Sequence, residues 1–149
     1  MNKLTKLEKY WILYDVGNSA FVMLVSTIIP IYFKNIASSA GISLSDSTAY
    51  YSYAVSISTL IVALTGPFLG SIGDCKNSRK PIFTFFMMIG VLGLAVLSIP
   101  VGWIVFLTIF IIAKVGFATS LIFYDSMLVD ITTSDRIDEV SSHGYAWGY

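Results

Sequence analysis

The chain has 149 residues, of which 56% are hydrophobic and 12% are charged, whereas about a quarter of the residues in an ordinary soluble domain are charged. Nine basic and nine acidic residues balance, so net charge gives no reason to expect nucleic acid or another polyanion as a partner. The single cysteine, Cys75, and the single histidine, His143, supply no disulfide, metal site or catalytic pair. We therefore predict an all-α integral membrane protein of the lipid bilayer, with no metal or cofactor, that is not an enzyme.

The first predicted helix begins before the membrane does. Thr5 and Glu8 have the spacing of a capping box, in which each side chain bonds a backbone N–H that the first helical turn leaves unpaired. From Trp11 to about Phe33 the residues are mainly apolar, and a run of this length crosses a bilayer at about 1.5 Å per residue. The run is too long for a signal peptide and lacks a small-residue cleavage site. We therefore expect a retained first span at 11–33.

Three more spans are predicted, at about 50–73, 82–99 and 103–129. The polar loop before them, 34–48, contains Ser45 and Ser47, either of which could cap the second span. Residues 130–143 are acidic and polar and predict a cytoplasmic loop, whereas 144–149 (GYAWGY) turn apolar again. We expect four transmembrane helices plus the start of a fifth, cut from a longer protein.

Lysine and arginine residues gather on one side of these spans. They flank the first span, lie between the second and third, and follow the fourth: Lys3, Lys6, Lys9, Lys76, Arg79, Lys80 and Arg136. The first loop has Lys34 alone, and the connection at Pro100 has none. By the positive-inside rule, the N-terminus, the turn after the second span and the segment after the fourth are expected to be cytoplasmic.

Lys114 is a residue that a bilayer should exclude. It lies about eleven residues into the fourth span, near ~16 Å of depth, where a charged residue costs roughly 2.5–3.5 kcal/mol. One hypothesis is a cavity lysine that attracts an anionic group of a solute or pairs with a coupling carboxylate. The alternative is a lysine that is paired within the bundle or that snorkels to water.

Three further polar residues lie in or near the membrane. Asp125 is on nearly the same helix face as Lys114 but about 16 Å away, so the two could line one aqueous path without forming an ion pair. Asp15 and Asn18 share a face of the first helix, and we expect Asp15 at a depth similar to that of Asp125. Both carboxylates would then face one cytoplasmic vestibule. The alternatives are an interfacial position for Asp125 and a helix-packing role for Asn18.

Small residues mark the second span. Gly66 and Gly70 form a Gly-x-x-x-Gly pair, which predicts the close approach of a neighbouring helix. Ser52, Ser56 and Thr59 form a stripe of small polar side chains on the same helix. We interpret this stripe as packing rather than ligand contact.

The stretch 70–80 (GSIGDCKNSRK) resembles the loop between the second and third helices of the major facilitator superfamily. That pattern is a Gly, an Asp four residues on and a short basic turn, and it is matched by Gly70, Asp74, Arg79 and Lys80. The sequence departs from the pattern at Cys75, Asn77 and Ser78. The resemblance implies that Asp74 and the two basic residues latch the cytoplasmic ends of the two halves of a transporter. The alternative is a positive loop that only sets topology.

Further stretches resemble the UMF1 group, relatives of the Atg22-like vacuolar effluxers. They are LYDVGNSAF (13–21), IIPIYF (28–33), and FYDSMLVDI with VSSHGYAWGY between 123 and 149. The family often has Asn where this chain has Asp125, so proton coupling through Asp125 does not carry over. The resemblance implies the N-terminal part of a major facilitator fold of about twelve helices in two halves, in which the first and fourth helices line the cavity.

By this resemblance the expected function is secondary active transport of a small solute by alternating access. The expected partners are the bilayer, the solute, a coupling proton and the missing C-terminal helices, and the expected location is a bacterial cytoplasmic membrane. Eukaryotic relatives are associated with amino-acid efflux. Two other interpretations stay open: a small four-helix multidrug exporter that acts as an oligomer, and a non-transporting membrane scaffold. Flux in vesicles separates the scaffold from both transporters.

Overall fold

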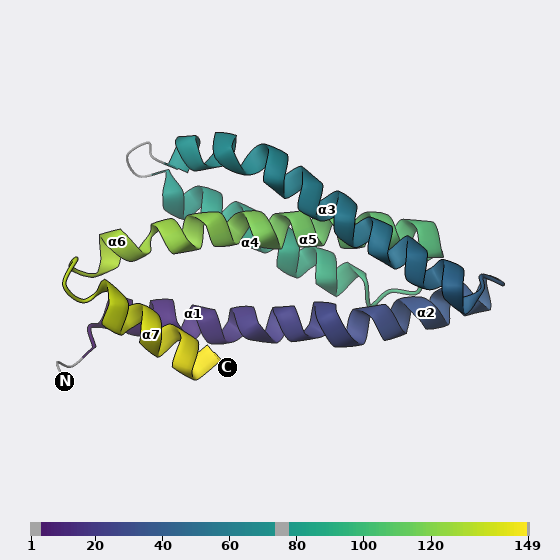
Figure 1. Cartoon of the computed structure of the whole chain (residues 1–149), viewed down its shortest axis with the longest axis horizontal. Helices are drawn as coiled ribbons and strands as arrows, with labels where there is room; N and C mark the ends of the chain where they lie inside the picture. Colours follow the sequence, from purple (N-terminus) through teal and green to yellow (C-terminus); the bar gives the residue numbers. More distant parts are fainter. Residues whose placement is uncertain (1–3, 74–77, 149) are drawn as a thin grey trace. The chain divides into compact units, whose positions relative to one another are not determined.

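The computed structural model describes residues 4–73 and 78–148, and these are almost entirely helical (Figure 1). The elements in chain order are α1 (Lys6–Met23), the π-helical turn η1 (Leu24–Ile28), α2 (Ile29–Ser39), α3 (Leu44–Gly73), α4 (Arg79–Val96), α5 (Trp103–Ser126), α6 (Leu128–Ile131) and α7 (Ile137–Gly148). No strand occurs in either described range. The predicted all-α class is confirmed.

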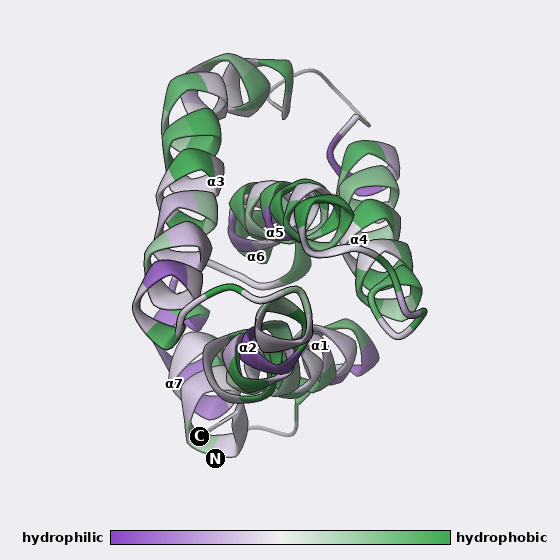
Figure 2. Cartoon of the chain, turned by 90° about the vertical axis from the view of Figure 1, so that its right-hand side faces the viewer, coloured by the Kyte–Doolittle hydropathy of each residue, from purple (hydrophilic) through white to green (hydrophobic). Residues whose placement is uncertain are grey.

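Four helical segments are long and apolar enough to cross a membrane: Lys6–Ser39, Leu44–Ile72, Arg79–Val96 and Trp103–Ser126. Figure 2 shows hydrophobic residues along much of α4 and along part of α3. Large apolar side chains such as Leu64, Phe68 and Phe85 are 64%, 73% and 62% exposed. Soluble proteins seldom leave such continuous apolar surface uncovered. The prediction of four spans in an integral membrane protein is confirmed.

The helices differ from the predicted elements at several ends. The first helical segment continues to Ser39 and α3 begins at Leu44, so most of the predicted loop 34–48 is helical. The cap of α3 is Ser43 and not Ser45 or Ser47, because the Ser43 hydroxyl accepts from the Asp46 N–H at 3.1 Å and donates to the Asp46 carboxylate at 2.7 Å. This pair satisfies a backbone N–H in the first turn of the helix and places the cap two residues before Ser45.

The segment 130–143, predicted as a cytoplasmic loop, is partly helical. After α5 ends at Ser126, α6 covers Leu128–Ile131, and α7 begins at Ile137. The acidic residues that suggested a solvated loop, Asp138 and Glu139, lie in the first turn of α7. Carboxylates at a helix N-terminus stabilise it by interaction with the helix dipole, so this acidity favours a helix start.

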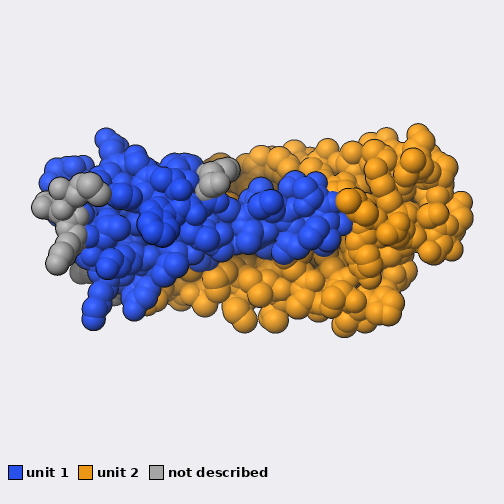
Figure 3. Space-filling model, turned by 90° about the horizontal axis from the view of Figure 1, so that it is seen from below, with its two compact units in different colours: residues 1–29, 126–149 blue, residues 30–125 orange. Residues whose placement is uncertain are grey.

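The chain divides into two compact units, coloured separately in Figure 3. Unit 1 comprises residues 1–29 and 126–149, and unit 2 comprises residues 30–125. The core of unit 2 contains an aromatic cluster in which Phe33 of α2 and Phe106 of α5 are fully buried, with ring centroids 5.6 Å apart. Tyr51 of α3 packs on Phe110 of α5 at 5.0 Å. These contacts join α2 and α3 to α5 at one end of the unit.

Glycines bring α4 and α5 into backbone contact. A Cβ built on Gly93 would lie 2.5 Å from the Cβ of Ala113, and one on Gly116 would lie 2.7 Å from the Ile89 side chain. Gly66 and Gly70 make no such close contact with the described residues, so the close approach of a helix at this pair stays a prediction. A Cβ on Gly66 makes an ordinary 3.4 Å contact, and one on Gly70 meets nothing within 4 Å. Small residues therefore do mediate helix packing here, but between α4 and α5.

In unit 1, α7 packs along α1. Gly144 lies against Trp11 and Asp15, because a Cβ at residue 144 would be 2.9 Å from the Trp11 ring and 3.2 Å from the Asp15 carboxylate. Gly148 lies one turn later, and a Cβ built on it would be 3.0 Å from the Ser19 hydroxyl and 3.3 Å from the Asp15 carboxylate. The spacing 144, 148 is again Gly-x-x-x-Gly, and it lets α7 approach the polar face of α1.

Glu8 joins the start of α1 to the segment before α7. The predicted capping box is confirmed, since the Glu8 carboxylate accepts from the Thr5 N–H at 2.7 Å and the Thr5 hydroxyl accepts from the Glu8 N–H at 3.2 Å. The same carboxylate accepts from the Thr132 hydroxyl at 2.8 Å and pairs with the Arg136 guanidinium at 3.0 Å. Glu8 is 1% exposed, so this network compensates a buried charge.

The α4–α5 contact predicts opposite outcomes for two glycine-to-alanine substitutions. Gly93→Ala adds overpacking of about 1–3 kcal/mol, which exceeds the gain of about 1 kcal/mol that alanine has over glycine in a helix. We expect a lower melting temperature in detergent, partly restored when Ala113→Gly is added. Gly17→Ala, where a Cβ meets nothing within 4 Å, is the control and should melt at or above the wild-type temperature. Equal melting of Gly93→Ala and wild type would contradict the packing.

The Glu8 network predicts a strong cost for removing its cation alone. Arg136→Met leaves a buried carboxylate without its charged partner and should destabilise the protein by about 3 kcal/mol. The double variant Glu8→Gln with Arg136→Met removes both charges and should recover part of that loss. Thermal melting of the four proteins of this double-mutant cycle measures the coupling. Additive effects, with no coupling, would show that the pair does not join α1 to the α7 segment.

Candidate functional site

Lys114 lies at the middle of the fourth candidate span. It is the twelfth of the 24 residues of α5, Trp103–Ser126, which is the helix with the largest buried share among the four spans. The flanking helix is apolar over its length, so the lysine cannot reach the helix ends along a polar face. The charge must therefore be compensated near the centre of the span.

The partners of Lys114 come from α3. Its ammonium donates to the Val55 carbonyl at 3.4 Å and to the Thr59 hydroxyl at 3.5 Å. The Thr59 hydroxyl itself donates to the Val55 carbonyl at 2.9 Å, so it turns a lone pair towards the lysine. Both contacts to the ammonium are longer than a typical N–H···O bond of about 2.9–3.0 Å. Lys114 is thus held against α3 by neutral groups and weakly.

Within the described ranges, no carboxylate pairs with Lys114. The neutral oxygens of α3 offset part of the desolvation of its charge, but an ion pair would offset more. The hypothesis of a lysine paired with a carboxylate inside this bundle therefore has no support among these residues. The hypothesis of a cavity lysine is the one that the arrangement favours.

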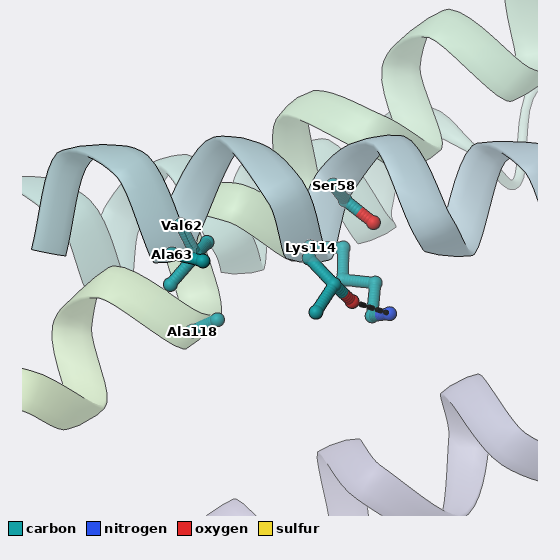
Figure 4. A pocket seen from close by; sticks show the side chains of 6 residues that line it. Ser58, Val62, Ala63, Lys114 and Ala118 are labelled. Carbon is teal, nitrogen blue, oxygen red and sulfur yellow. Dashed lines mark hydrogen bonds between the residues drawn. The ribbon is translucent and has the colours of Figure 1, made fainter.

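A pocket of about 230 Å³ opens beside Lys114 (Figure 4). It is lined by four residues of α3 and two of α5: Ser58, Thr59, Val62, Ala63, Lys114 and Ala118. Figure 4 shows two ends, with the polar groups of Ser58 and Lys114 at one and the side chains of Val62, Ala63 and Ala118 at the other. The volume is below the 300–1,000 Å³ of pockets for drug-sized ligands.

The other predicted site residues lie elsewhere in the two units. Asp125 is the penultimate residue of α5 in unit 2, about 16 Å of helical rise from Lys114. Asp15 and Asn18 lie in unit 1, where the Asp15 carboxylate packs against the two glycines of α7. The Asn18 side-chain oxygen is buried and has no hydrogen-bond partner among the residues described. The common vestibule for Asp15 and Asp125 stays a prediction.

The predicted latch is only partly within the described structure. Gly70 lies in the last turn of α3, and Arg79 and Lys80 are the first two residues of α4. Asp74 lies outside the described residues. Both cations lie at the N-terminus of α4, where the helix dipole does not favour a positive charge. The latch stays a prediction.

Several features of the site were not foreseen from the sequence. The sequence predicts a packing role for Thr59, whereas in the structure the Thr59 hydroxyl and the Val55 carbonyl both accept hydrogen bonds from the Lys114 ammonium. A signal was available, because Thr59 is a small polar residue near the centre of a span as Lys114 is. The apolar end formed by Val62 and Ala63 had no signal, since such residues are ordinary in any span. Among the described residues, no group of three or more His, Cys, Asp or Glu side chains could hold a metal ion.

Comparison with known proteins places these features in a family. Residues 43–145 match the family described as vacuole effluxer Atg22 like. The chain is also 40% identical over 152 residues to a Bacillus subtilis (strain 168) protein described as an uncharacterized MFS-type transporter, YxiO. That alignment covers 100% of this chain, and the chain spans 36% of the length of the relative. No solved structure matches the chain.

The family match extends from the start of α3 into α7 and includes every residue that lines the Lys114 pocket. The relative belongs to the superfamily that the stretch 70–80 resembles. The chain therefore belongs to the Atg22-like family of major facilitator proteins, as its sequence motifs predicted.

Proposed function

We propose that the complete protein is a secondary active transporter that moves a small solute across the membrane by alternating access, with the Lys114 pocket on the solute path. One observation carries this proposal: a lysine at the centre of a span borders a pocket and has no carboxylate partner among the described residues. A charge in the membrane interior usually faces a water-filled cavity and marks a substrate or ion pathway. Membership in a family described as effluxers supports the same function.

The proposal places this chain in a larger architecture. The chain spans 36% of its relative, and four spans are about a third of the twelve that a major facilitator fold contains. We propose that it is the N-terminal part of such a fold, in the bacterial cytoplasmic membrane with a cytoplasmic N-terminus, and that further helices complete the cavity. Gly70, Asp74, Arg79 and Lys80 would then latch the cytoplasmic ends of the two halves.

The finer roles of the remaining polar residues belong to this proposal too. Asp15, Asn18 and Asp125 would lie towards the cytoplasmic end of the path, where a carboxylate can exchange a coupling proton. Amino-acid efflux is the specific activity that the family resemblance suggests. An α-amino acid fits the pocket in size and carries a carboxylate for Lys114.

Lys114→Met in the complete protein should lower transport at least about tenfold, which corresponds to about 1.4 kcal/mol, because the neutral side chain keeps the volume but not the charge. The assay is counterflow in proteoliposomes, with a panel of radiolabelled amino acids and small carboxylates used first to find a transported solute. Lys114→Arg should retain part of the activity. Ile112→Met is the matched control, since Ile112 is on the same helix, 54% exposed and outside the pocket. Unchanged flux in Lys114→Met at normal membrane insertion would refute a role on the solute path, and absence of flux in the wild type would favour a scaffold.

The proposed architecture also predicts how far the open reading frame extends in the source genome. Sequencing the source genome downstream of the codon for Tyr149 should show an open frame that continues into about eight more hydrophobic spans. A stop codon at that point, with a stable product in the membrane, would contradict the twelve-helix architecture and favour a four-helix oligomer.

A further inference from the structure

At the polar end of the pocket, the side-chain hydrogen-bond donor available to a ligand is the Lys114 ammonium. A lysine ammonium has three N–H groups, and two of them are directed at the Val55 carbonyl and the Thr59 hydroxyl. The hydroxyl hydrogens of the neighbouring residues are already used within α3. The single hydroxyl hydrogen of Ser58 is shared between the Ala54 carbonyl at 2.9 Å and the Val55 carbonyl at 2.8 Å, and Thr59 donates to Val55 at 2.9 Å. The third N–H of Lys114 is therefore the side-chain donor that this end offers to a ligand.

The charge at this end is also of one sign. None of the six lining residues is acidic, and the hydroxyl lone pairs of Ser58 and Thr59 lie beside a cation. A ligand group with a negative charge would neutralise the ammonium in a low-dielectric setting, where the attraction is much stronger than in water. A ligand whose only charged group is an ammonium would instead be repelled by Lys114.

The residues at the opposite end of the pocket determine which chemical group the rest of the ligand should carry. Val62, Ala63 and Ala118 present only methyl groups, and Figure 4 shows them grouped away from the Lys114 nitrogen. A short hydrocarbon chain gains free energy by burial against such groups, about 0.8 kcal/mol for each CH₂. The pocket of about 230 Å³ between α3 and α5 has room for a short chain of this kind.

From this layout we propose, resting on the transport function above, that the pocket recognises the carboxylate of a small amphipathic monoanion. One carboxylate oxygen accepts from the free N–H of Lys114, and a branched or linear hydrocarbon chain lies along Val62, Ala63 and Ala118. The carboxylate is the required group. An α-ammonium group is not needed by these residues, so a simple carboxylic acid and the amino acid with the same side chain both occupy the pocket.

The test is equilibrium binding of radiolabelled 4-methylpentanoate to the complete protein in nanodiscs. Leucine and unlabelled 4-methylpentanoate should compete, whereas 4-methylpentan-1-ol and 3-methylbutylamine should be at least about tenfold weaker, because neither supplies an anion. Lys114→Met should lose binding at least about tenfold, and Lys114→Arg should keep the order of the competitors. Absence of 4-methylpentanoate binding, or equal competition by the amine or the alcohol, would overturn the proposal.

A second variant tests the apolar end without touching the charge. Ala63→Leu fills part of the pocket from an exposed position of α3, so it should weaken 4-methylpentanoate by at least about tenfold and spare acetate and propionate. Ala95→Leu is the matched control, because Ala95 is an exposed residue of α4 outside the pocket. An equal effect of Ala63→Leu on all chain lengths, or an equal effect of both variants, would overturn the placement of the hydrocarbon chain.

Two further outcomes separate the possible sources of the anion and the two proposals. Binding should be the same in phosphatidylcholine nanodiscs with and without phosphatidylglycerol. Loss of the probe only when the anionic lipid is present would assign Lys114 to a lipid headgroup and overturn the small-monoanion proposal. Flux of a solute found in the counterflow screen, with no preference for carboxylates, would overturn this inference while leaving the transport function standing. Carboxylate binding without any flux would overturn the transport function and leave the recognition of a carboxylate standing.

Discussion

The rest of this structure depends on the free energy of holding one ammonium group at the centre of an apolar span. A lysine there costs roughly 2.5–3.5 kcal/mol on insertion scales, and the side-chain hydrogen bonds of Lys114 within the described residues reach another helix. The compensation comes from α3, whose Val55 carbonyl and Thr59 hydroxyl face Lys114. Because both groups are neutral and their contacts of 3.4 and 3.5 Å are long for hydrogen bonds, they offset the desolvation of the ammonium only in part. Among the described residues, Lys114 therefore lacks the paired carboxylate of a structural ion pair.

The helices around α5 explain why the lysine can be presented in this way. On the α4 side, Gly93 and Gly116 remove the side chains that would separate the two helices. At one end, the rings of Phe33 and Phe106 fill the space between α2 and α5. The α3 side is packed less tightly beside Lys114, and the pocket lies there. Dense packing on two sides therefore supports a hollow on the third.

The sequence predicts those parts of the structure that depend on hydrophobicity and local spacing. The four spans follow from runs of apolar residues, and the Thr5–Glu8 capping box follows from a separation of three residues. Lys114 is found because charge in a span is rare. Each of these features needs no knowledge of which helices are neighbours.

The features that the sequence does not predict all depend on that knowledge. A Gly-x-x-x-Gly pair such as Gly66 and Gly70 shows that a helix can approach closely, but not which partner it has, and the close contact in the structure is at Gly93. The pair of Glu8 with Arg136 joins residues far apart in the chain. The latch residue Asp74 lies outside the described residues. Non-local pairing is the information that a single sequence lacks.

The contact between α4 and α5 has a mechanical consequence. Backbone and Cβ atoms meet where Gly93 lies against Ala113 and where Gly116 lies against Ile89, so a slide of one helix past the other by a single residue would drive a side chain into a backbone. Packed interfaces of this kind shift between discrete arrangements and do not deform continuously. The two helices therefore form a stiff double rod. A movement that keeps this packing turns α4 and α5 together as one body.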